Sequence, residues 1–146
     1  MLKTFLFGSV DVKSNTTHYA LLALRIFTGL SMAFAHGLGK IPPSEGFINN
    51  AGNMGFPFPV VFAWAAALSE FLGGIFLALG FLTRPSAIFL GLTMLTAAFL
   101  RHADDPFSGK EKALLYLVIC IFLVLTGSGK FGIDNTFQKD KPKYYV

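Results

Sequence analysis

Four long apolar stretches constrain this chain more strongly than any other feature of its sequence. They cover residues 19–38, about 57–82, 86–100 and 113–127, and prolines interrupt the chain between them. A membrane-spanning helix needs about 20 mainly apolar residues, so the second stretch is long enough alone. The third and fourth reach that length when flanking basic side chains extend to the interface. The stretches are too long for barrel strands and show no alternation, so we predict an all-α integral membrane four-helix bundle.

The composition agrees with a membrane protein and excludes several other classes. Hydrophobic residues make up 53% of the 146 residues and charged residues 14%, whereas soluble domains carry about 25% charged residues. The single cysteine, Cys120, excludes a disulfide scaffold and a cysteine zinc site, and no other metal site is predicted. The net charge of +4 is scattered beside apolar stretches, so no nucleic-acid partner is expected.

The distribution of basic residues predicts the orientation of the bundle. With an even number of spans both termini lie on one side, and that side carries seven Lys and Arg residues against four on the other. The seven are Lys3, Lys13, Arg84, Lys130, Lys139, Lys141 and Lys143. The four are Lys40, Arg101, Lys110 and Lys112. Because cytoplasmic segments carry the excess of Lys and Arg, both termini are predicted to be cytoplasmic.

Two ionisable residues lie well inside the apolar stretches, Arg25 and Glu70. Such residues are costly in a bilayer and face the interior of a bundle. On an ideal helix Arg25 shares one sector with Gly29, and Glu70 shares a face with Gly73 and Gly74, which suits close helix packing. Their estimated depths are similar enough for the long arginine side chain to reach the carboxylate. We predict a buried Arg25–Glu70 pair, which either belongs to a functional site or only sets the register of the two helices.

A second group of polar residues is expected where the first and third stretches end. Its members are His36, Lys40, Arg101, His102, Asp104, Asp105 and Glu111. This mixture of acid, base and imidazole can move protons or hold an anionic headgroup. The alternative is a solvated rim, which we favour for all of them except His36, because His36 lies on the packing sector of its helix. His36 and His102 could also ligate a haem, but the chain has no haem-attachment motif and we do not expect one.

The order of several short motifs resembles the DoxX family of small four-helix membrane proteins. The matching elements are Arg25-x-x-x-Gly29, His36-Gly37-x-x-Lys40, Glu70-x-x-Gly73-Gly74, Gly80-Phe81-Leu82-Thr83-Arg84, His102, Glu111 and the segment 127–134, GSGKFGID. The chain departs from the family at Gly132, where a serine is common. The resemblance implies a bacterial inner-membrane protein, and relatives are associated with membrane oxidoreductase assemblies, including the small subunit of a thiosulfate–quinone oxidoreductase.

The resemblance and the polar residues together lead to three functional hypotheses. The first is a small non-catalytic subunit of a quinone-linked oxidoreductase system, with a polar site at Arg25, His36, Lys40 and Glu70. The chain would carry no cofactor of its own, and any quinone would come through a partner. The second is a binding or transport module for a small amphiphile or lipid, and the third is a structural membrane scaffold. The expected partners are membrane lipid and either another membrane or redox subunit or a second copy of the chain.

The apolar stretches and the extent of the resemblance divide the chain into three parts. Residues 1–17 are predicted to form a polar N-terminal segment. Residues 18–134 are predicted to form the DoxX-like transmembrane domain, and residues 135–146 a basic C-terminal tail.

Overall fold

The computed structural model describes residues 6–9 and 14–138, which are helical and contain no strand. Residues 1–5, 10–13 and 139–146, which include parts of the predicted N-terminal segment and C-terminal tail, lie outside the described residues. The helices in chain order are α2 (Asn15–Leu30), η1 (Ser31–Gly37), η2 (Leu38–Lys40), α3 (Glu45–Asn53), α4 (Pro59–Leu79), α5 (Thr83–Thr96), η3 (Ala97–Arg101), α6 (Phe107–Thr126) and η4 (Ile133–Gln138). Here η1 and η3 are wider π-helical continuations of α2 and α5, whereas η2 and η4 are short 3-10 helices.

Three of these continuous helices are long and apolar enough to cross a membrane. They are Asn15–Lys40, Pro59–Leu79 and Thr83–Arg101. The fourth long helix, α6, has 20 residues but begins with a charged turn that contains Lys110, Glu111 and Lys112. The prediction of an all-helical membrane protein is therefore confirmed for the described residues.

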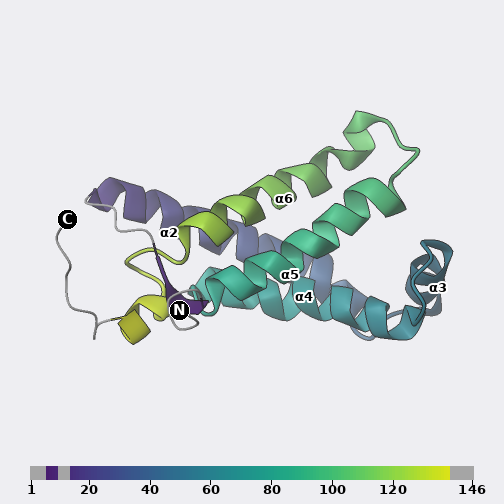
Figure 1. Cartoon of the computed structure of the whole chain (residues 1–146), viewed down its shortest axis with the longest axis horizontal. Coiled ribbons are helices and arrows are strands. Elements are labelled where there is room, and N and C mark those ends of the chain that lie inside the picture. The colour runs from purple at the N-terminus through teal and green to yellow at the C-terminus, as the bar shows by residue number, and fades with distance from the viewer. Residues whose placement is uncertain (1–5, 10–13, 139–146) are drawn as a thin grey trace.

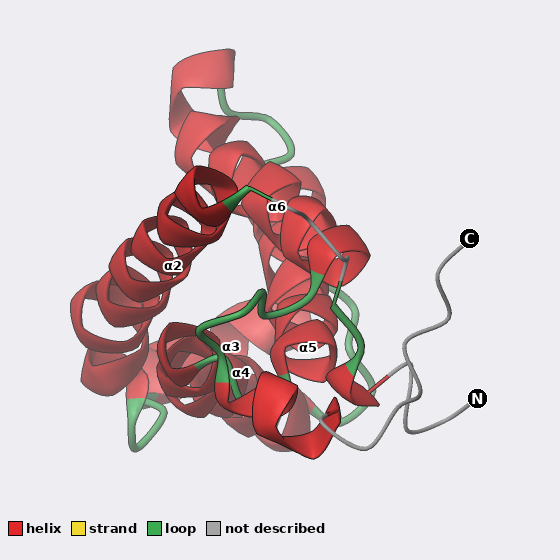
Figure 2. Cartoon of the chain, turned by 90° about the vertical axis from the view of Figure 1, so that its left-hand side faces the viewer, coloured by secondary structure: helices red, strands yellow, loops and turns green. Residues whose placement is uncertain are grey.

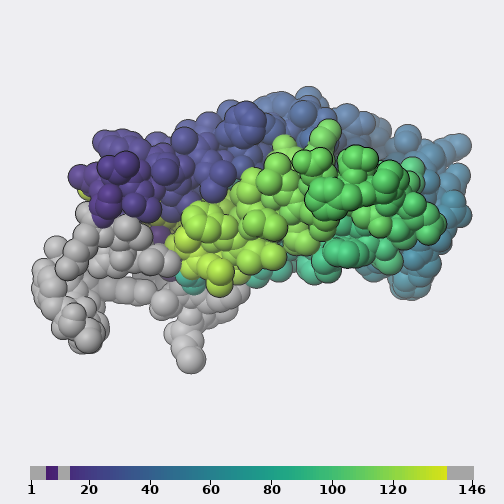
Figure 3. Space-filling model, turned by 90° about the horizontal axis from the view of Figure 1, so that it is seen from above, coloured from purple at the N-terminus to yellow at the C-terminus, as the bar shows by residue number. Residues whose placement is uncertain are grey.

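The helices pack side by side with α4 near the centre. α4 packs against α2, α5 and α3, and α5 packs against α6. Figure 1 shows α3 and the α5–α6 loop at one end of the molecule, which we call the α3 end, and the α4–α5 turn at the other. Seen along the bundle in Figure 2, α2 and α6 lie on the same side of the α4–α5 layer, with α2 packed on α4 and α6 packed on α5. From above, Figure 3 shows α2 and α6 beside each other along one face.

The interior contains both apolar and polar side chains, whereas large apolar side chains cover the outside. Leu77, Leu90 and Leu123 are fully buried between the helices. In contrast, Phe27 is 73% exposed, and many other apolar side chains along the helices are exposed to a lesser degree. A soluble protein rarely exposes so large an apolar area, and a lipid-facing surface requires it.

The structure differs from the sequence prediction in one additional helix and in the start of the fourth long helix. The loop after the first stretch contains α3, in which the Ser44 hydroxyl oxygen caps the helix by accepting from the Phe47 amide at 3.3 Å. The hydropathy of this segment is too low to indicate a helix that packs on α4. The fourth helix begins at Phe107 and not near Ala113, because its polar first turns extend beyond the apolar stretch.

Candidate functional site

The ion pair between Lys40 and Glu70 is the centre of a group of polar residues near the middle of α4. The Lys40 Nζ atom donates to Glu70 Oε1 at 2.7 Å and to Oε2 at 2.5 Å. The Glu70 side chain is only 3% exposed, whereas that of Lys40 is 33% exposed. The carboxylate is thus held inside the bundle, and the ammonium group reaches it from the edge.

A close contact between backbones places these two residues together. A side chain at Gly37 would meet the backbone of Phe71, 2.5 Å from its nitrogen, and the carbonyl carbon of Glu70 at 2.8 Å. Only a glycine therefore lets η1 approach α4 at the level of Glu70. The π-helical geometry of η1 also changes the angular spacing of residues 31–37 relative to an ideal helix. Such π segments are frequent at functional sites.

His36 lies beside this ion pair and contacts α6. Its ring packs edge-on against Tyr116, with 5.8 Å between ring centroids and 77° between the ring planes. The charged groups that act on the imidazole are Glu70, Lys40 and Lys112. We call His36, Lys40, Glu70 and Tyr116 the lysine–glutamate site. Three of its members were predicted as site residues, and the structure brings those three together.

Arg25, the fourth predicted member, lies elsewhere, and the predicted Arg25–Glu70 pair is wrong. The Arg25 side chain is fully buried, and its Nη1 atom donates to the Leu77 carbonyl oxygen at 3.2 Å. Its Nε and Nη2 atoms have no hydrogen-bond partner among the described residues. The carboxylate that acts on the Arg25 charge belongs to Asp134.

Asp134 joins the C-terminal segment to the α4–α5 turn. Its carboxylate accepts hydrogen bonds from the Leu82 amide at 2.7 Å and the Thr83 amide at 2.9 Å, and its own amide donates to the Gly80 carbonyl at 2.8 Å. Gly80 has φ +68°, and a side chain there would collide with the Arg25 guanidinium. We call Arg25, Gly80 and Asp134 the arginine clasp. It places a cation at the carbonyl end of α4 and an anion at the amide end of α5, as the helix dipoles favour.

The register of α2 against α4 explains why Arg25 does not reach Glu70. A side chain at Gly74 would come within 2.7 Å of the Gly29 carbonyl oxygen, so these two glycines lie at the same level. Gly37 lies at the level of Glu70. Arg25 and Gly37 are twelve residues apart, which corresponds to about 18 Å along a helix. This distance is too long for an arginine side chain to cover. The depths predicted from the boundaries of the apolar stretches were wrong because the two helices do not begin at the same level.

The predicted group of outer polar residues does not assemble into one cluster. His102 Nδ1 lies 2.6 Å from Asp105 Oδ2, a neighbour three residues along the chain. Arg101, Asp104 and Glu111 are exposed and form no ion pair with another described residue. For these residues the structure agrees with the solvated-rim interpretation.

Two residues of these sites were missed by the sequence analysis, and one predicted packing residue does not pack closely. Tyr116 was not among the predicted site residues, although its position one turn before the buried Cys120 on α6 is a signal that it faces inward. Asp134 was noted only as the last residue of the 127–134 segment. An acidic residue after a glycine-rich segment is a signal that it caps the start of a helix. Gly73 was predicted to pack closely against another helix. A side chain at this position would have the Ser86 carbonyl oxygen as its nearest neighbour, 3.9 Å away, so the packing there is not close.

The lysine–glutamate site combines donors with groups that exchange protons. The Lys40 ammonium, the imidazole and the Tyr116 hydroxyl can donate hydrogen bonds to a carbonyl oxygen, and Glu70 and His36 can take up or release a proton. Among the described residues there is no group of three or more His, Cys, Asp or Glu side chains that could hold a metal ion. The site is therefore suited to a polar organic headgroup.

Comparisons with known proteins place the chain among bacterial membrane proteins. Residues 20–103 match the DoxX family. The protein named "Putative oxidoreductase CatD" of Bacillus subtilis (strain 168) is 35% identical over 121 residues, which cover 82% of this chain and 88% of that protein. The protein named "Inner membrane protein YqjF" of Escherichia coli (strain K12) is 36% identical over 113 residues, or 70% of this chain and 81% of that protein. No solved structure matches the chain.

Proposed function

The chain belongs to the DoxX family, and from that premise we propose that it is the small membrane subunit of a quinone-linked oxidoreductase system. It is a multi-pass protein of the bacterial inner membrane, since it has three apolar helices of spanning length and a relative that is named an inner membrane protein. The name of the Bacillus relative supports the redox part of the proposal. In this proposal the lysine–glutamate site receives the quinone headgroup.

The buried ion pair is the observation that carries the proposal. A charged pair inside a membrane protein is costly and marks functional positions more often than structural ones. Lys40, which is partly exposed, holds a carboxylate that is only 3% exposed. A neutral headgroup with two carbonyl oxygens would find donors in Lys40 and His36, and its ring would lie near the aromatic ring of Tyr116.

The chain's own groups would handle protons, and a partner would carry the electrons. A quinone, when bound, accepts electrons and protons together. His36 and Glu70 would supply or remove protons at the headgroup, because both belong to the same site. The electron carrier is assigned to a partner subunit, since this chain has a single cysteine and its described residues contain no cluster of metal ligands.

The proposal includes a complete topology of four spans with both termini in the cytoplasm. α6 supplies the fourth span, because it packs along α5 and its apolar part is extended by basic side chains that reach the interface at its charged start. The charged first turn of α6 would lie in the interface at the α3 end. The opposite end, with the α4–α5 turn and η4, would then face the cytoplasm, in agreement with the excess of basic residues.

The single tryptophan provides a direct test of headgroup binding. Trp64 lies six residues before Glu70 on α4, about 9 Å along the helix, so a quinone bound at the lysine–glutamate site should quench its fluorescence. A short-chain ubiquinone analogue is titrated into the purified protein in nanodiscs. We expect saturable quenching in the native protein and at least tenfold weaker binding in Glu70→Gln.

The matched control is Glu111→Gln, which removes an exposed carboxylate near the same end of the bundle. It should bind the analogue within about twofold of the native protein. Thermal unfolding of all three proteins shows whether they are folded. Unsaturable quenching, or equal affinity in native protein and Glu70→Gln, would overturn the proposed headgroup site.

A further inference from the structure

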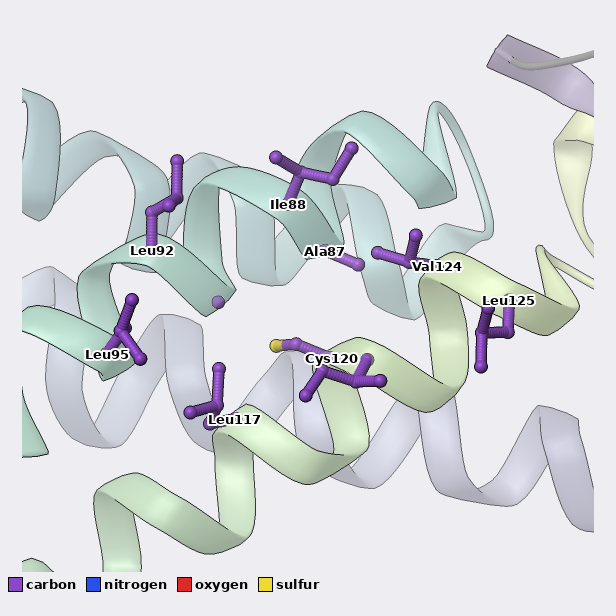
Figure 4. A pocket seen from close by; sticks show the side chains of 10 residues that line it. Ala87, Ile88, Leu92, Leu95, Leu117, Cys120, Val124 and Leu125 are labelled. Atoms are coloured by element: carbon purple, nitrogen blue, oxygen red, sulfur yellow. The ribbon is translucent and has the colours of Figure 1, made fainter.

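Two regions between the helices differ in the groups that they offer to a ligand. Between α5 and α6 lies a slot of about 230 Å³, and the ten residues that line it, including Leu92 and Leu117, are all apolar (Figure 4). The lining of this slot therefore does not select a polar ligand. The region beside the α4–α5 turn is different, because a charged side chain, that of Arg25, is fully buried there. This polar region is the one that has groups to bind an ion.

One edge of the Arg25 guanidinium group is free of protein acceptors. The Nη1 atom donates to the Leu77 carbonyl oxygen, whereas Nε and Nη2 have no hydrogen-bond partner in the described part of the chain. Nε and Nη2 carry N–H bonds that point in parallel from the same edge of the group. Guanidinium groups use two parallel N–H bonds to hold two oxygen atoms of one anion. A bidentate donor is thus available inside the bundle.

Two buried threonine hydroxyls belong to the same region. Thr28 lies three residues after Arg25 on α2, so the two residues share a face of the helix. Thr83 begins α5, three residues after Gly80, where a side chain would collide with the Arg25 guanidinium. Neither hydroxyl has a hydrogen-bond partner among residues 6–9 and 14–138. Because buried polar groups are almost always hydrogen-bonded, a ligand that accepts from these donors is expected.

The nearby Asp134 carboxylate does not occupy the free edge of Arg25. It accepts from the amides of Leu82 and Thr83 and makes no direct ion pair with Arg25. The amino end of α5 compensates part of its negative charge. A buried cation without a direct counter-ion is costly in a membrane protein. Water donates as well as accepts, whereas the nitrogen atoms of Arg25 only donate, so an anion suits them better than water does.

We propose that Arg25, together with the hydroxyl groups of Thr28 and Thr83, binds one small planar oxyanion of the size of formate or bicarbonate. Two oxygen atoms of the anion accept from Nε and Nη2, and the hydroxyls donate to its remaining lone pairs. The ligand has to be small, because none of the three residues is more than 1% exposed. The site lies about 18 Å along the first helix from the level of Glu70 and does not depend on the proposed quinone site.

Formate and formamide provide the test, because they have nearly the same shape and differ in charge. The full chain is purified in nanodiscs in sodium gluconate, whose anion is too large for the buried site. Sodium formate then replaces gluconate at constant ionic strength. We expect formate to raise Tm in a saturable manner and radiolabelled formate to bind once per chain. Formamide at the same concentrations should produce no saturable shift.

Two variants locate the binding at Arg25. Arg25→Lys keeps the charge but removes the parallel donors, so it should weaken formate binding about tenfold or more. Thr28→Val replaces a hydroxyl by a methyl group and should weaken formate binding about threefold or more. The matched controls are Arg101→Lys, at an exposed arginine, and Thr126→Val, whose hydroxyl already donates to the Phe122 carbonyl at 2.9 Å. Both controls should bind formate like the native protein.

The possible results separate this site from the proposed quinone site. Arg25→Lys should bind the quinone analogue like the native protein, and Glu70→Gln should bind formate like the native protein. Thr28→Val keeps the shape of its side chain, so it tests the proposal even if Arg25→Lys does not fold. Formate that fails to bind in a saturable manner would overturn the anion site and assign the free donors to water. Equal stabilisation by formamide, or equal formate affinity in native protein and Thr28→Val, would overturn it as well.

Discussion

Lys40 and Glu70 show how a membrane protein can keep a carboxylate away from both water and lipid. The two hydrogen bonds from the Lys40 ammonium occupy both oxygens of Glu70, and Lys40 also lies 5.4 Å from the centre of the Phe47 ring. Removing one partner of such a pair leaves the other charge dehydrated, which costs more than removing both. The pair can therefore be dissected by comparing single and double substitutions.

The first prediction separates a functional pair from a structural one. Lys40→Met should lower the free energy of unfolding by about 1–3 kcal/mol, because it leaves Glu70 without its charged donor. The double variant Lys40→Met/Glu70→Gln should recover part of this loss, since no buried charge is left unpaired. Thermal unfolding measures the stability, and Trp64 quenching measures headgroup binding. A folded double variant that binds the quinone analogue normally would show that the pair has a structural role and that the headgroup does not need it.

The arginine clasp leads to a second prediction, on stability alone. Arg25→Met should destabilise the protein by about 1–3 kcal/mol, because the Leu77 carbonyl loses its bond to Arg25 and Asp134 loses its opposing charge. Asp134→Asn should destabilise it as well, since a neutral amide is a weaker cap for α5. The two losses should be less than additive in the double variant, as measured by a thermal double-mutant cycle. Strict additivity would show that the two residues act independently.

At the scale of helices, small residues set the distance between α2 and α4. The Gly29 and Gly74 backbones touch, and Gly37 repeats the contact two turns farther along. Helices in lipid gain no hydrophobic energy from association, so close backbone packing has to hold them together. The polar side chains then occupy the two ends of this contact, with the lysine–glutamate site beyond Gly37 and the arginine clasp beyond Gly29.

The third prediction concerns this helix contact. Gly74→Ala should destabilise the bundle by about 1–3 kcal/mol, because the added methyl group would overlap the Gly29 carbonyl and the Ala33 amide. Gly39→Ala is the matched control, since a side chain there has no atom within 4 Å. The control should be neutral or slightly stabilising. Equal melting temperatures for the two variants in the same detergent would contradict the packing argument.

At the scale of the whole molecule, the two polar clusters lie at different levels of one apolar bundle, about 18 Å apart along the first helix. The described residues near the two chain ends also lie together, because the rings of Phe7 and Phe137 are in contact, with 5.0 Å between their centroids. Such an arrangement suits four antiparallel spans, in which each polar cluster lies closer to one membrane surface.

The fourth prediction tests this topology by labelling. In a Cys120→Ala background, Asp104→Cys lies at the α3 end and Asn135→Cys lies at the opposite end. Intact cells are treated with a membrane-impermeant maleimide. We expect labelling of Asp104→Cys without permeabilisation and labelling of Asn135→Cys only after permeabilisation. The reverse pattern would invert the orientation, and labelling of both in intact cells would exclude an even number of spans.

Much of this architecture follows from local sequence patterns. The apolar stretches predicted the long helices, because the requirement for internal hydrogen bonds leaves few other structures in lipid. They did not predict α3, whose few apolar residues become informative only when they meet α4. The pattern also identified His36, Lys40 and Glu70 as candidates, since charged residues within or at the end of an apolar stretch need a protected location.

The pairing of these residues depended on how the helices meet in space. An apolar stretch tells where a helix lies along the chain, but its register against a neighbour is set by contacts such as Gly29–Gly74 and Gly37–Glu70. These contacts place Glu70 beside Lys40. They place Arg25 beside the α4–α5 turn, about 18 Å along the helix from the level of Glu70. Composition and periodicity are properties of one segment, whereas register is a property of two. For that reason the residues of the candidate site could be named from the sequence, but their partners could not.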